Sequence, residues 1–359
     1  MTQENVMVTK ETLEIACGRI LEAAGVPPSG AAVAAENLVE ADLKGIHTHG
    51  VMRLPVYVKR LRKGLVNAKP DLAFSPLSRN SWLLDGDNGL GQVVAAAAME
   101  HAVVQAASEN IAVVLVKNSN HFGAAGYYTA KAAEAGMIGF CTTNSLPLMA
   151  ATGGCERVIG NNPFALSCPR KEHPPVTFDM SCSKVPVGKI LMYESRGEKI
   201  PEGWALDREG RPTTDPSEAY RRGGILLPVG EHKGYGLALI MEILAGVLTG
   251  AAFSNGIGSL YDLSGATKMN LGHFIMALDV GSLMSEDTFY ERLEELLGSV
   301  LSSTRVDNEK PVFLPGEIEE RRKLQHVEKG IPMKKTVLED LRGLARDLSV
   351  SVELPVCEL

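Results

Sequence analysis

The sequence lacks the short motifs that mark several large enzyme classes. No GxGxxG dinucleotide fingerprint, P-loop, HExxH zinc motif or GxSxG nucleophile elbow occurs in the 359 residues. The segments 89–94 and 234–239 begin as GxG but have no third glycine. These absences exclude several common nucleotide-binding and hydrolytic families, but they do not name a reaction.

Cysteine is sparse and unpaired. The six cysteines form no CxxC motif and show no pairing with nearby histidines, so we expect neither a zinc site nor a redox pair, and no metal. Most lie in apolar stretches, where a free thiol behaves as a small hydrophobe. Residues 1–14 contain no apolar signal-peptide core. The combination predicts a cytoplasmic protein.

The sequence contains one short basic run and no larger cluster of positive charge. Lys and Arg number 36 against 43 Asp and Glu, for a net charge of −7, and the basic run 59–63 looks like the solvated end of a helix. Phosphate backbones and anionic membranes are bound by clustered Lys and Arg. We therefore expect neither a nucleic-acid nor a membrane partner.

One long apolar stretch could be mistaken for a membrane span. Residues 234–253 contain one charge, Glu242, in twenty residues. The acid near mid-span, four glycines and the lack of aromatic or basic flanks favour a buried helix instead.

Hydrophobic periodicity predicts helices toward both ends of the chain and a mixed α/β region between them. At 45% apolar residues, the chain is long enough for two ordinary domains. Helices are expected at 10–24, 29–44, 51–65 (interrupted by Pro55), 92–107, 124–135, 234–250, 286–302, about 316–328 and 334–347. Strands are expected from Trp82 and at 111–116, 137–143, 164–168, 176–180 and 274–280. Polar coil around Pro70 and Pro76 marks a domain boundary, and 195–230 is a long irregular excursion.

The strand–turn–helix unit at 111–135 carries the first candidate site residue. His121 lies in the polar turn 118–123, at the end of a strand, where functional sites are commonly built. Its imidazole can exchange a proton near neutral pH. A lone histidine in a turn is more often a surface or hydrogen-bonded residue, so the turn alone leaves both interpretations open.

Three other segments offer partners for such a histidine. Arg53 and Tyr57 are four residues apart on a predicted helix and share a face, and a guanidinium fork suits a carboxylate. Asp179 is expected at a strand end. Lys233 begins the apolar helix, where a cation opposes the helix dipole and suggests a bound anion. Ordinary solvated charges are the competing interpretation for each.

Six motifs in this order resemble the type-2 malate/L-lactate dehydrogenase family, which includes ureidoglycolate and sulfolactate dehydrogenases. They cover roughly residues 8–330 and read GIHTHGVMRLPVY (45–57), SNHFGAAGYYTAKAAEAGMIGF (119–140), GNNPFAL (160–166), FDMSCSKVPVGK (178–189), IPEGWALDREGRPTTDP (200–216) and PVGEHKGYGLALIMEILAGVLTGA (228–251). The resemblance implies an α/β fold with a non-Rossmann cofactor-binding domain built on a mixed sheet, and a helical domain formed from both chain ends. The implied division is 1–78 and 300–359 for the helical part and 79–299 for the cofactor-binding domain.

The resemblance also implies an activity: hydride transfer between NAD or NADP and C2 of a small 2-hydroxy or 2-oxo acid. The small carboxylate substrate would bind in a homodimer, near the subunit interface. His121 resembles the general acid/base and Arg53 the carboxylate clamp. Thr48 and His49 resemble residues that help the clamp, and both are expected to be catalytic along with His121 and Arg53. Tyr57 is expected to bind the substrate together with Arg53 and His49. The positions similar to cofactor contacts are Ser145, Asp179, Met180, Ser181, Lys233, Pro315, Gly316 and Glu317.

Two departures from the family pattern bear on the substrate. Many members have Asp-Ser-His where this chain has His47-Thr48-His49. Ureidoglycolate enzymes share the first histidine, but they have an acid where this chain has Leu146 and lack its Asn-His-Phe-Gly form at 120–123, so ureidoglycolate is disfavoured. Reduction of a cyclic imino acid and non-catalytic cofactor binding are the alternatives. NAD against NADP, stereochemistry and direction stay open.

Overall fold

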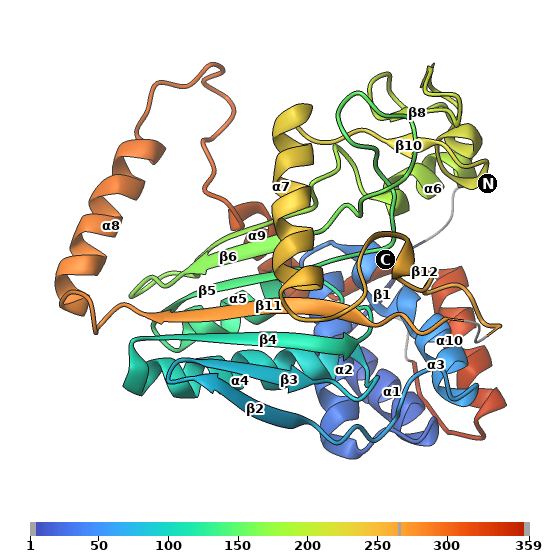
Figure 1. Ribbon diagram of the computed structural model, residues 1–359, viewed down its shortest axis with the longest axis horizontal. Coiled ribbons are helices and arrows are strands. Elements are labelled where there is room, and N and C mark those ends of the chain that lie inside the picture. The colour runs from blue at the N-terminus through green and yellow to red at the C-terminus, as the bar shows by residue number, and fades with distance from the viewer. Residues whose placement is uncertain (1–4, 265–266, 355–359) are drawn as a thin grey trace.

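A seven-stranded mixed sheet forms the centre of the protein (Figure 1). The computed structural model describes residues 5–264 and 267–354. The spatial order of the sheet is β2-β3-β4-β11-β5-β6-β7. Its strands are β2 (Ala73–Ser78), β3 (Ser81–Asp85), β4 (Ile111–Ser119), β5 (Met137–Thr143), β6 (Phe164–Cys168), β7 (Val176–Met180) and β11 (Leu271–Asp279). Only β3 and β4 run parallel; the other neighbouring pairs are antiparallel. Strand β11, from late in the chain, therefore separates β4 from β5.

Two helices cover one face of this sheet. Helix α4 (Gly91–Glu109) packs on β4 and β11, and α5 (Gly126–Glu134) packs on β5 and β6. The contact is close because the facing residues are small. A Cβ at Gly139 would lie 2.8 Å from both the Ala132 Cβ and the Thr129 carbonyl oxygen. The close contact places the start of α5, and the loop before it, directly against the sheet.

Segments from both ends of the chain pack into a second core. It joins buried residues of the early helices, such as Leu13 and Leu38, to Leu338 and Leu341 near the C-terminus. Strand β1 pairs antiparallel with β12 beside them. The elements are β1 (Asn5–Val8), α1 (Lys10–Ala23), α2 (Pro28–Leu43), α3 (Leu54–Arg62), α9 (Glu317–Lys329), β12 (Ile331–Lys334) and α10 (Lys335–Asp347).

A third group of elements follows β7 in the chain, contains the region predicted to be irregular, and ends in a helix and a π-helical turn that pack against β5 and β11. A three-stranded sheet in the order β10-β8-β9 organises part of it. The elements are α6 (Val187–Arg196), β8 (Ala205–Leu206), β9 (Pro212–Thr213), a π-helical turn (Ser217–Arg221), β10 (Ile225–Leu226), α7 (His232–Glu242) and a second π-helical turn (Ile243–Val247). Helix α8 (Glu286–Leu301) projects away from the body of the molecule (Figure 1).

Prolines account for two errors in the predicted elements. The helix predicted over 51–65 is a 3₁₀ turn (Val51–Arg53) followed by α3, and Pro55 lies in the first turn of α3 rather than interrupting a helix. First-turn N–H groups have no intrahelical acceptor, so proline costs little there. Residues 73–78, predicted as coil, form β2, whose edge position tolerates Pro76. The sheet therefore starts before the expected boundary at residue 78.

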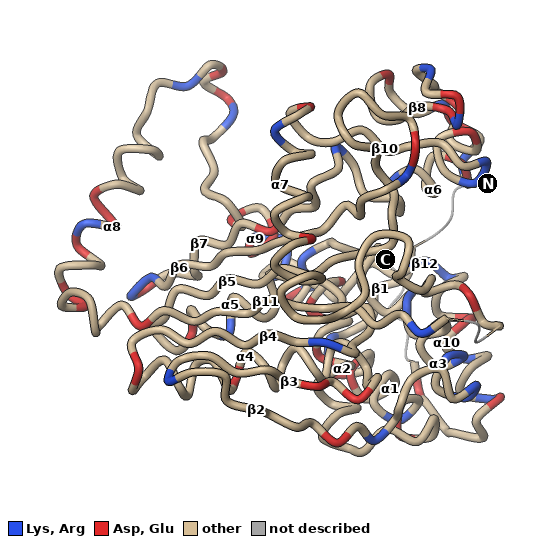
Figure 2. Tube along the Cα trace, in the orientation of Figure 1, with Lys and Arg blue, Asp and Glu red and all other residues tan. Residues whose placement is uncertain are grey.

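The apolar stretch at 234–253 does form a helix, but the prediction of burial is wrong for the single chain. Ile240, Val247 and Leu248 each leave more than half of their surface exposed, at 51%, 55% and 53%. The chain trace along α7 carries no charged residue between Lys233 and Glu242 (Figure 2). Of the helices in the described part of the chain, none is long and apolar enough to cross a membrane.

Candidate active site

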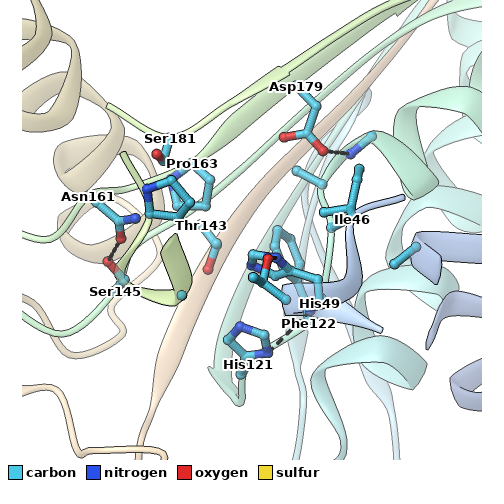
Figure 3. Close-up of a pocket in the computed structure, with 18 of the residues that line it drawn as sticks. Ile46, His49, His121, Phe122, Thr143, Ser145, Asn161, Pro163, Asp179 and Ser181 are labelled. Carbon is cyan, nitrogen blue, oxygen red and sulfur yellow. Dashed lines mark hydrogen bonds between the residues drawn. The ribbon is translucent and has the colours of Figure 1, made fainter. Parts of the chain in front are cut away.

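One cavity of about 540 Å³ collects most of the residues singled out in the sequence. Its volume is within the range of small-molecule and cofactor sites. It lies between the sheet and the segments that follow α2, with side chains converging from both (Figure 3). The predicted residues that line it are Thr48, His49, Arg53, His121, Ser145, Asp179, Met180, Ser181, Pro315 and Gly316. Tyr57, Lys233 and Glu317 are not among its lining residues.

The loop that carries His121 is held by the residue before it. Strand β4 continues to Ser119, three residues further than predicted. The buried Asn120 side chain donates to the carbonyl oxygens of Gly89 at 2.8 Å and Asn88 at 3.1 Å. A Cβ at Gly91 would lie 2.2 Å from the Asn120 carbonyl oxygen, so only glycine lets α4 begin so close. These contacts fix the backbone from which His121 projects.

A buried tyrosine fixes the ring of His121. The Tyr57 hydroxyl lies 2.7 Å from His121 Nδ1. Tyr57 is only 4% exposed, and burial raises the pKa of its phenol, so the hydroxyl stays neutral. It therefore lies behind His121 rather than at the cavity surface, a different position from the substrate contact expected. With Nδ1 occupied, Nε2 is the nitrogen that remains for a ligand.

The cavity favours the neutral form of His121. Enclosure in the cavity wall lowers the pKa of His121 well below its usual value, and the nearby His49 and Arg53 lower it further. The His49 ring stacks beside it with 5.8 Å between the centroids. The pKa of His49 is itself lowered to about 4, by burial and then by Arg53. At neutral pH His121 is therefore a free base.

The guanidinium of Arg53 is oriented by two partners. Its Nε donates to the Thr48 carbonyl oxygen at 2.6 Å, and its Nη1 donates to the hydroxyl of Tyr261. Thr48 is fixed in turn, because a Cβ at Gly188 would lie 2.6 Å from the Thr48 methyl carbon. The rest of the guanidinium faces the cavity, where an anion can bind.

An aspartate that sequence reasoning did not single out holds the turn between His47 and Val51. Asp42 is 1% exposed; one carboxylate oxygen accepts from the Val51 N–H at 2.7 Å and the other pairs with His47 Nδ1 at 2.7 Å. A Cβ at Gly50 would lie 2.2 Å from this carboxylate. Asp42 thus fixes the turn that presents Thr48 and His49.

Polar groups on the far side of the cavity form a second part of the site. The Ser145 hydroxyl donates to Asn161 Oδ1 at 2.8 Å (Figure 3). The Asp179 carboxylate accepts from the Gly126 N–H at the start of α5 at 2.7 Å. The Asp179 side chain is exposed at the cavity surface, yet the protein around the cavity removes enough water from the carboxylate to raise its pKa from 3.8 to about 6, against the opposing effects of the Gly126 hydrogen bond and of Lys44.

This second part fits a nicotinamide dinucleotide. The start of α6 at Pro186–Gly188 lines the cavity and has no acidic residue in its first turn, and such helix N-termini favour phosphate groups. The start of α9 at Pro315–Gly316 also lines the cavity, but Glu317, Glu319 and Glu320 in its first turn oppose a phosphate there. Gly316 has a φ of +84°, and a Cβ there would lie 2.8 Å from the Thr177 carbonyl oxygen, so glycine allows the loop to approach β7. The hydroxyl and carboxylate groups around Ser145 and Asp179 suit ribose and amide groups.

Two predicted cofactor positions lie apart from the cavity. Lys233 is exposed at the start of α7. Glu317 accepts from the Leu314 N–H at 2.9 Å and pairs with Arg321, so it shapes the loop before α9. Direct cofactor contact stays a prediction for both.

Other lining residues were missed because no local pattern marks them. Tyr261 follows a glycine-rich turn and Tyr220 lies on a π-helical turn, in segments distant from Arg53 in the sequence. Glu40, Lys44 and Glu320 meet at one end of the cavity, where the Lys44 ammonium lies 3.2 Å and 2.9 Å from the two carboxylates. Only α2 and α9 packing together makes that cluster.

Comparison with known proteins agrees with this geometry. A sequence profile described as malate/L-lactate dehydrogenase matches residues 8–342. The chain is 40% identical over 357 residues to a malate dehydrogenase of Pyrococcus horikoshii, covering 96% of both chains. It is 37% identical over 353 residues to an L-sulfolactate dehydrogenase of Methanothermobacter thermautotrophicus, covering 98% of both.

A solved structure agrees as well. The sulfolactate dehydrogenase of Methanocaldococcus jannaschii superposes with a TM-score of 0.89 at 35% identity, covering 96% of this chain and 98% of that one. Further relatives are named as dehydrogenases that use NAD(+) or NADP(+). With a profile that matches most of its length, the chain belongs to the malate/L-lactate dehydrogenase family.

Proposed function

We propose that the protein is an NAD(P)-dependent oxidoreductase that transfers hydride between nicotinamide and C2 of a small 2-hydroxy or 2-oxo acid. The observation that carries this proposal is the pairing of two groups in one cavity. His121 has Nδ1 held by Tyr57 and Nε2 left over, and Arg53 lies on the same wall with part of its guanidinium free. A proton-transfer group beside a carboxylate clamp is what a 2-hydroxy acid requires.

Arg53 orients the substrate in this proposal. Its Nε is bound to the Thr48 carbonyl oxygen, so the Nη groups are the ones that meet the substrate carboxylate. Ion pairing with a planar fork fixes both the position and the rotation of the carboxylate. The 2-oxygen of the substrate is then set toward His121 rather than toward solvent.

His121 moves the proton. The step needs the His121 tautomer in which Nδ1 carries the hydrogen and donates it to the Tyr57 oxygen. In the oxidation direction, the free Nε2 lone pair then takes the proton from the 2-hydroxyl group, and Nδ1–H keeps its hydrogen bond to Tyr57 in the imidazolium. In the reduction direction, imidazolium returns the proton to the 2-oxygen. A bound carboxylate offsets the charge of Arg53, one of the groups that lower the pKa of His121, so substrate binding makes its protonation easier.

A nicotinamide cofactor would be held by residues of the second part of the site: Ser145, Asp179 to Ser181, Pro315 and Gly316. When bound, the cofactor would donate a hydride to C2 of the substrate or accept one from it. The names of the relatives include both NAD(+) and NADP(+) enzymes, so the choice between the two is left to measurement.

We also propose a homodimer, with the apolar face of α7 against a second copy of the chain. The exposed side chains Ile240, Val247 and Leu248 support this proposal, because large apolar patches on a folded chain mark interaction sites. Sedimentation of the purified protein tests the dimer.

The proposed domain division has separate support. The core formed from segments at both chain ends supports a helical domain. The mostly antiparallel sheet supports a cofactor-binding domain that is not of the Rossmann type.

The activity is tested by oxidation of NADH and of NADPH against oxaloacetate, pyruvate, 2-oxoglutarate, glyoxylate, a diketo sugar acid and a cyclic imino acid. Strong turnover of one 2-oxo acid with one cofactor is the expected result. Turnover of the imine alone would replace the proposal with imine reduction. A folded protein that binds cofactor but turns over nothing on the panel would contradict the proposed function.

A further inference from the structure

A segment far along the chain brings a tyrosine hydroxyl to the proposed carboxylate clamp. Tyr261 accepts a hydrogen bond from Arg53 Nη1 across a sequence separation of 208 residues. The guanidinium carbon lies 5.9 Å from the centre of the Tyr261 ring, and both residues line the cavity. The Tyr261 side chain is 52% exposed, so it is not part of the protein core.

The direction of this hydrogen bond leaves the tyrosine proton unused. A guanidinium can only donate, so the phenol oxygen accepts from it and keeps its own O–H to donate. Within the described residues, no acceptor for that proton is found. An anion bound to Arg53 would therefore meet the N–H groups of the guanidinium and the O–H of Tyr261 together.

A buried arginine holds the segment that carries Tyr261. Arg60 Nη1 lies 3.2 Å from the Ser259 carbonyl oxygen and 3.1 Å from that of Asp262, one on each side of Tyr261. Lys63 Nζ donates to the Leu263 carbonyl oxygen at 3.0 Å. Arg60 is a charged residue only 1% exposed. Burying a charge is costly unless it has partners, and these carbonyl groups provide them.

Helix α3 therefore connects the proposed proton-transfer group and the proposed carboxylate clamp to the segment that carries Tyr261. Arg53 directly precedes it, Tyr57 holds His121, and Arg60 and Lys63 anchor the segment 259–263. Positions 53, 57 and 60 follow the helical repeat and share one face. A shift of this helix would move the clamp, the proton-transfer group and the tyrosine together.

We propose that Tyr261 is a substrate-binding residue, which donates its hydroxyl proton to the substrate carboxylate beside Arg53, and that Arg60 positions it. The proposal rests on the proposed function and adds a specific contact to it. Segment 259–263 then selects substrates by their carboxylate end, and the ring of Tyr261 limits the space beside it.

The direct test is Tyr261→Phe, which removes the hydroxyl and keeps the ring. A hydrogen bond to a charged group contributes enough that the KM for the preferred 2-oxo acid should rise about 10-fold. The KM for the reduced cofactor should not change. Tyr290→Phe, which removes a hydroxyl from the projecting helix α8, is the matched control and should behave as wild type. An unchanged KM for the 2-oxo acid in Tyr261→Phe would overturn the proposal.

Binding without turnover separates this proposal from the proposed function. The protein saturated with oxidised cofactor is titrated calorimetrically with the 2-oxo acid, a pair that cannot react. We expect Tyr261→Phe to bind the acid about 10-fold more weakly than wild type. If wild type reduces nothing on the panel, the proposed function fails. If wild type is active and the variant binds the acid equally well, only the assignment of Tyr261 fails.

The positioning role of Arg60 is tested by a double-mutant cycle. Arg60→Gln should raise the KM for the 2-oxo acid, and adding Tyr261→Phe should then have little further effect, because coupled residues are not additive. Fully additive effects would reject the coupling. Lys63→Met, at the surface, is the second variant in case Arg60→Gln does not fold; it should show a smaller KM increase and the same loss of additivity with Tyr261→Phe.

Discussion

The Tyr57 hydroxyl lies 2.7 Å from Nδ1 of His121, although 64 residues separate them in the sequence. The contact defines which imidazole nitrogen faces the cavity. It also joins the proton-transfer group to α3, the helix that directly follows Arg53. The proposed proton-transfer group and the proposed carboxylate clamp are therefore both positioned by α3.

Replacing His121 by alanine tests its proposed role in proton transfer. We expect His121→Ala to lower kcat/KM by about 10²–10⁴-fold, the usual contribution of a general acid or base. The exposed His173 provides the matched control, His173→Ala, which should keep full activity. Normal turnover by His121→Ala on the preferred substrate would refute the assigned role.

Removing the Tyr57 hydroxyl tests its control over the ring of His121. Tyr57→Phe keeps the buried ring but leaves Nδ1 without its partner, so we expect kcat to fall about 10-fold with little change in the KM for cofactor. The pH profile of kcat should also shift, because the hydroxyl no longer contacts the imidazolium. A change in thermal stability with an unaltered pH profile would instead indicate a purely structural role.

Arg53→Lys tests the fork geometry of the clamp. A lysine ammonium keeps the charge but cannot reach the Thr48 carbonyl oxygen and the carboxylate in one plane. The KM for the 2-oxo acid should rise by about 10²-fold while the KM for cofactor is maintained. The clamp hypothesis would also be wrong if wild type reduced an analogue without a carboxylate equally well.

The lowered pKa of His121 predicts opposite pH dependences for the two directions. Oxidation needs the free base, so kcat/KM for the 2-hydroxy acid should be level from neutral to mildly alkaline pH and fall only in acid. Reduction needs imidazolium, so its kcat/KM should increase as the pH falls toward the pKa. Rate profiles in both directions measure this. A rise in reduction rate with increasing pH would exclude His121 as the acid.

The raised pKa of Asp179 predicts a conflict between stability and binding. Between pH 3.8 and about 6 the folded protein holds a proton that the unfolded chain has lost, so this residue makes stability fall as the pH rises through that window. Asp179→Asn removes the charge, so at about pH 8 its Tm should be about 2 °C higher than that of wild type, and at acidic pH the two should converge. Cofactor binding by the variant should be weaker. Equal Tm differences at both pH values would contradict this account.

Local chemistry made much of the fold predictable. The β-branched run before Lys117, the small-residue segment after His121 and the apolar periodicity near both ends predict strands and helices that the structure contains. The errors occur where position in the sheet or the assembly matters more than local preference. Pro76 is compatible with a strand only because β2 is at an edge, and the apolar face of α7 is exposed because nothing in the single chain packs over it.

The sequence by itself determined the turn at His121 and the spacing of Arg53 and Tyr57, because turns and helix faces depend on neighbours a few residues away. The tertiary structure alone decided what these residues contact. Tyr57 points at His121 instead of lining the cavity, and Tyr261 reaches Arg53 because Arg60 holds its segment. Such pairings join segments 64 to 208 residues apart. They depend on how the helices pack and on where β11 lies in the sheet, and local periodicity predicts neither.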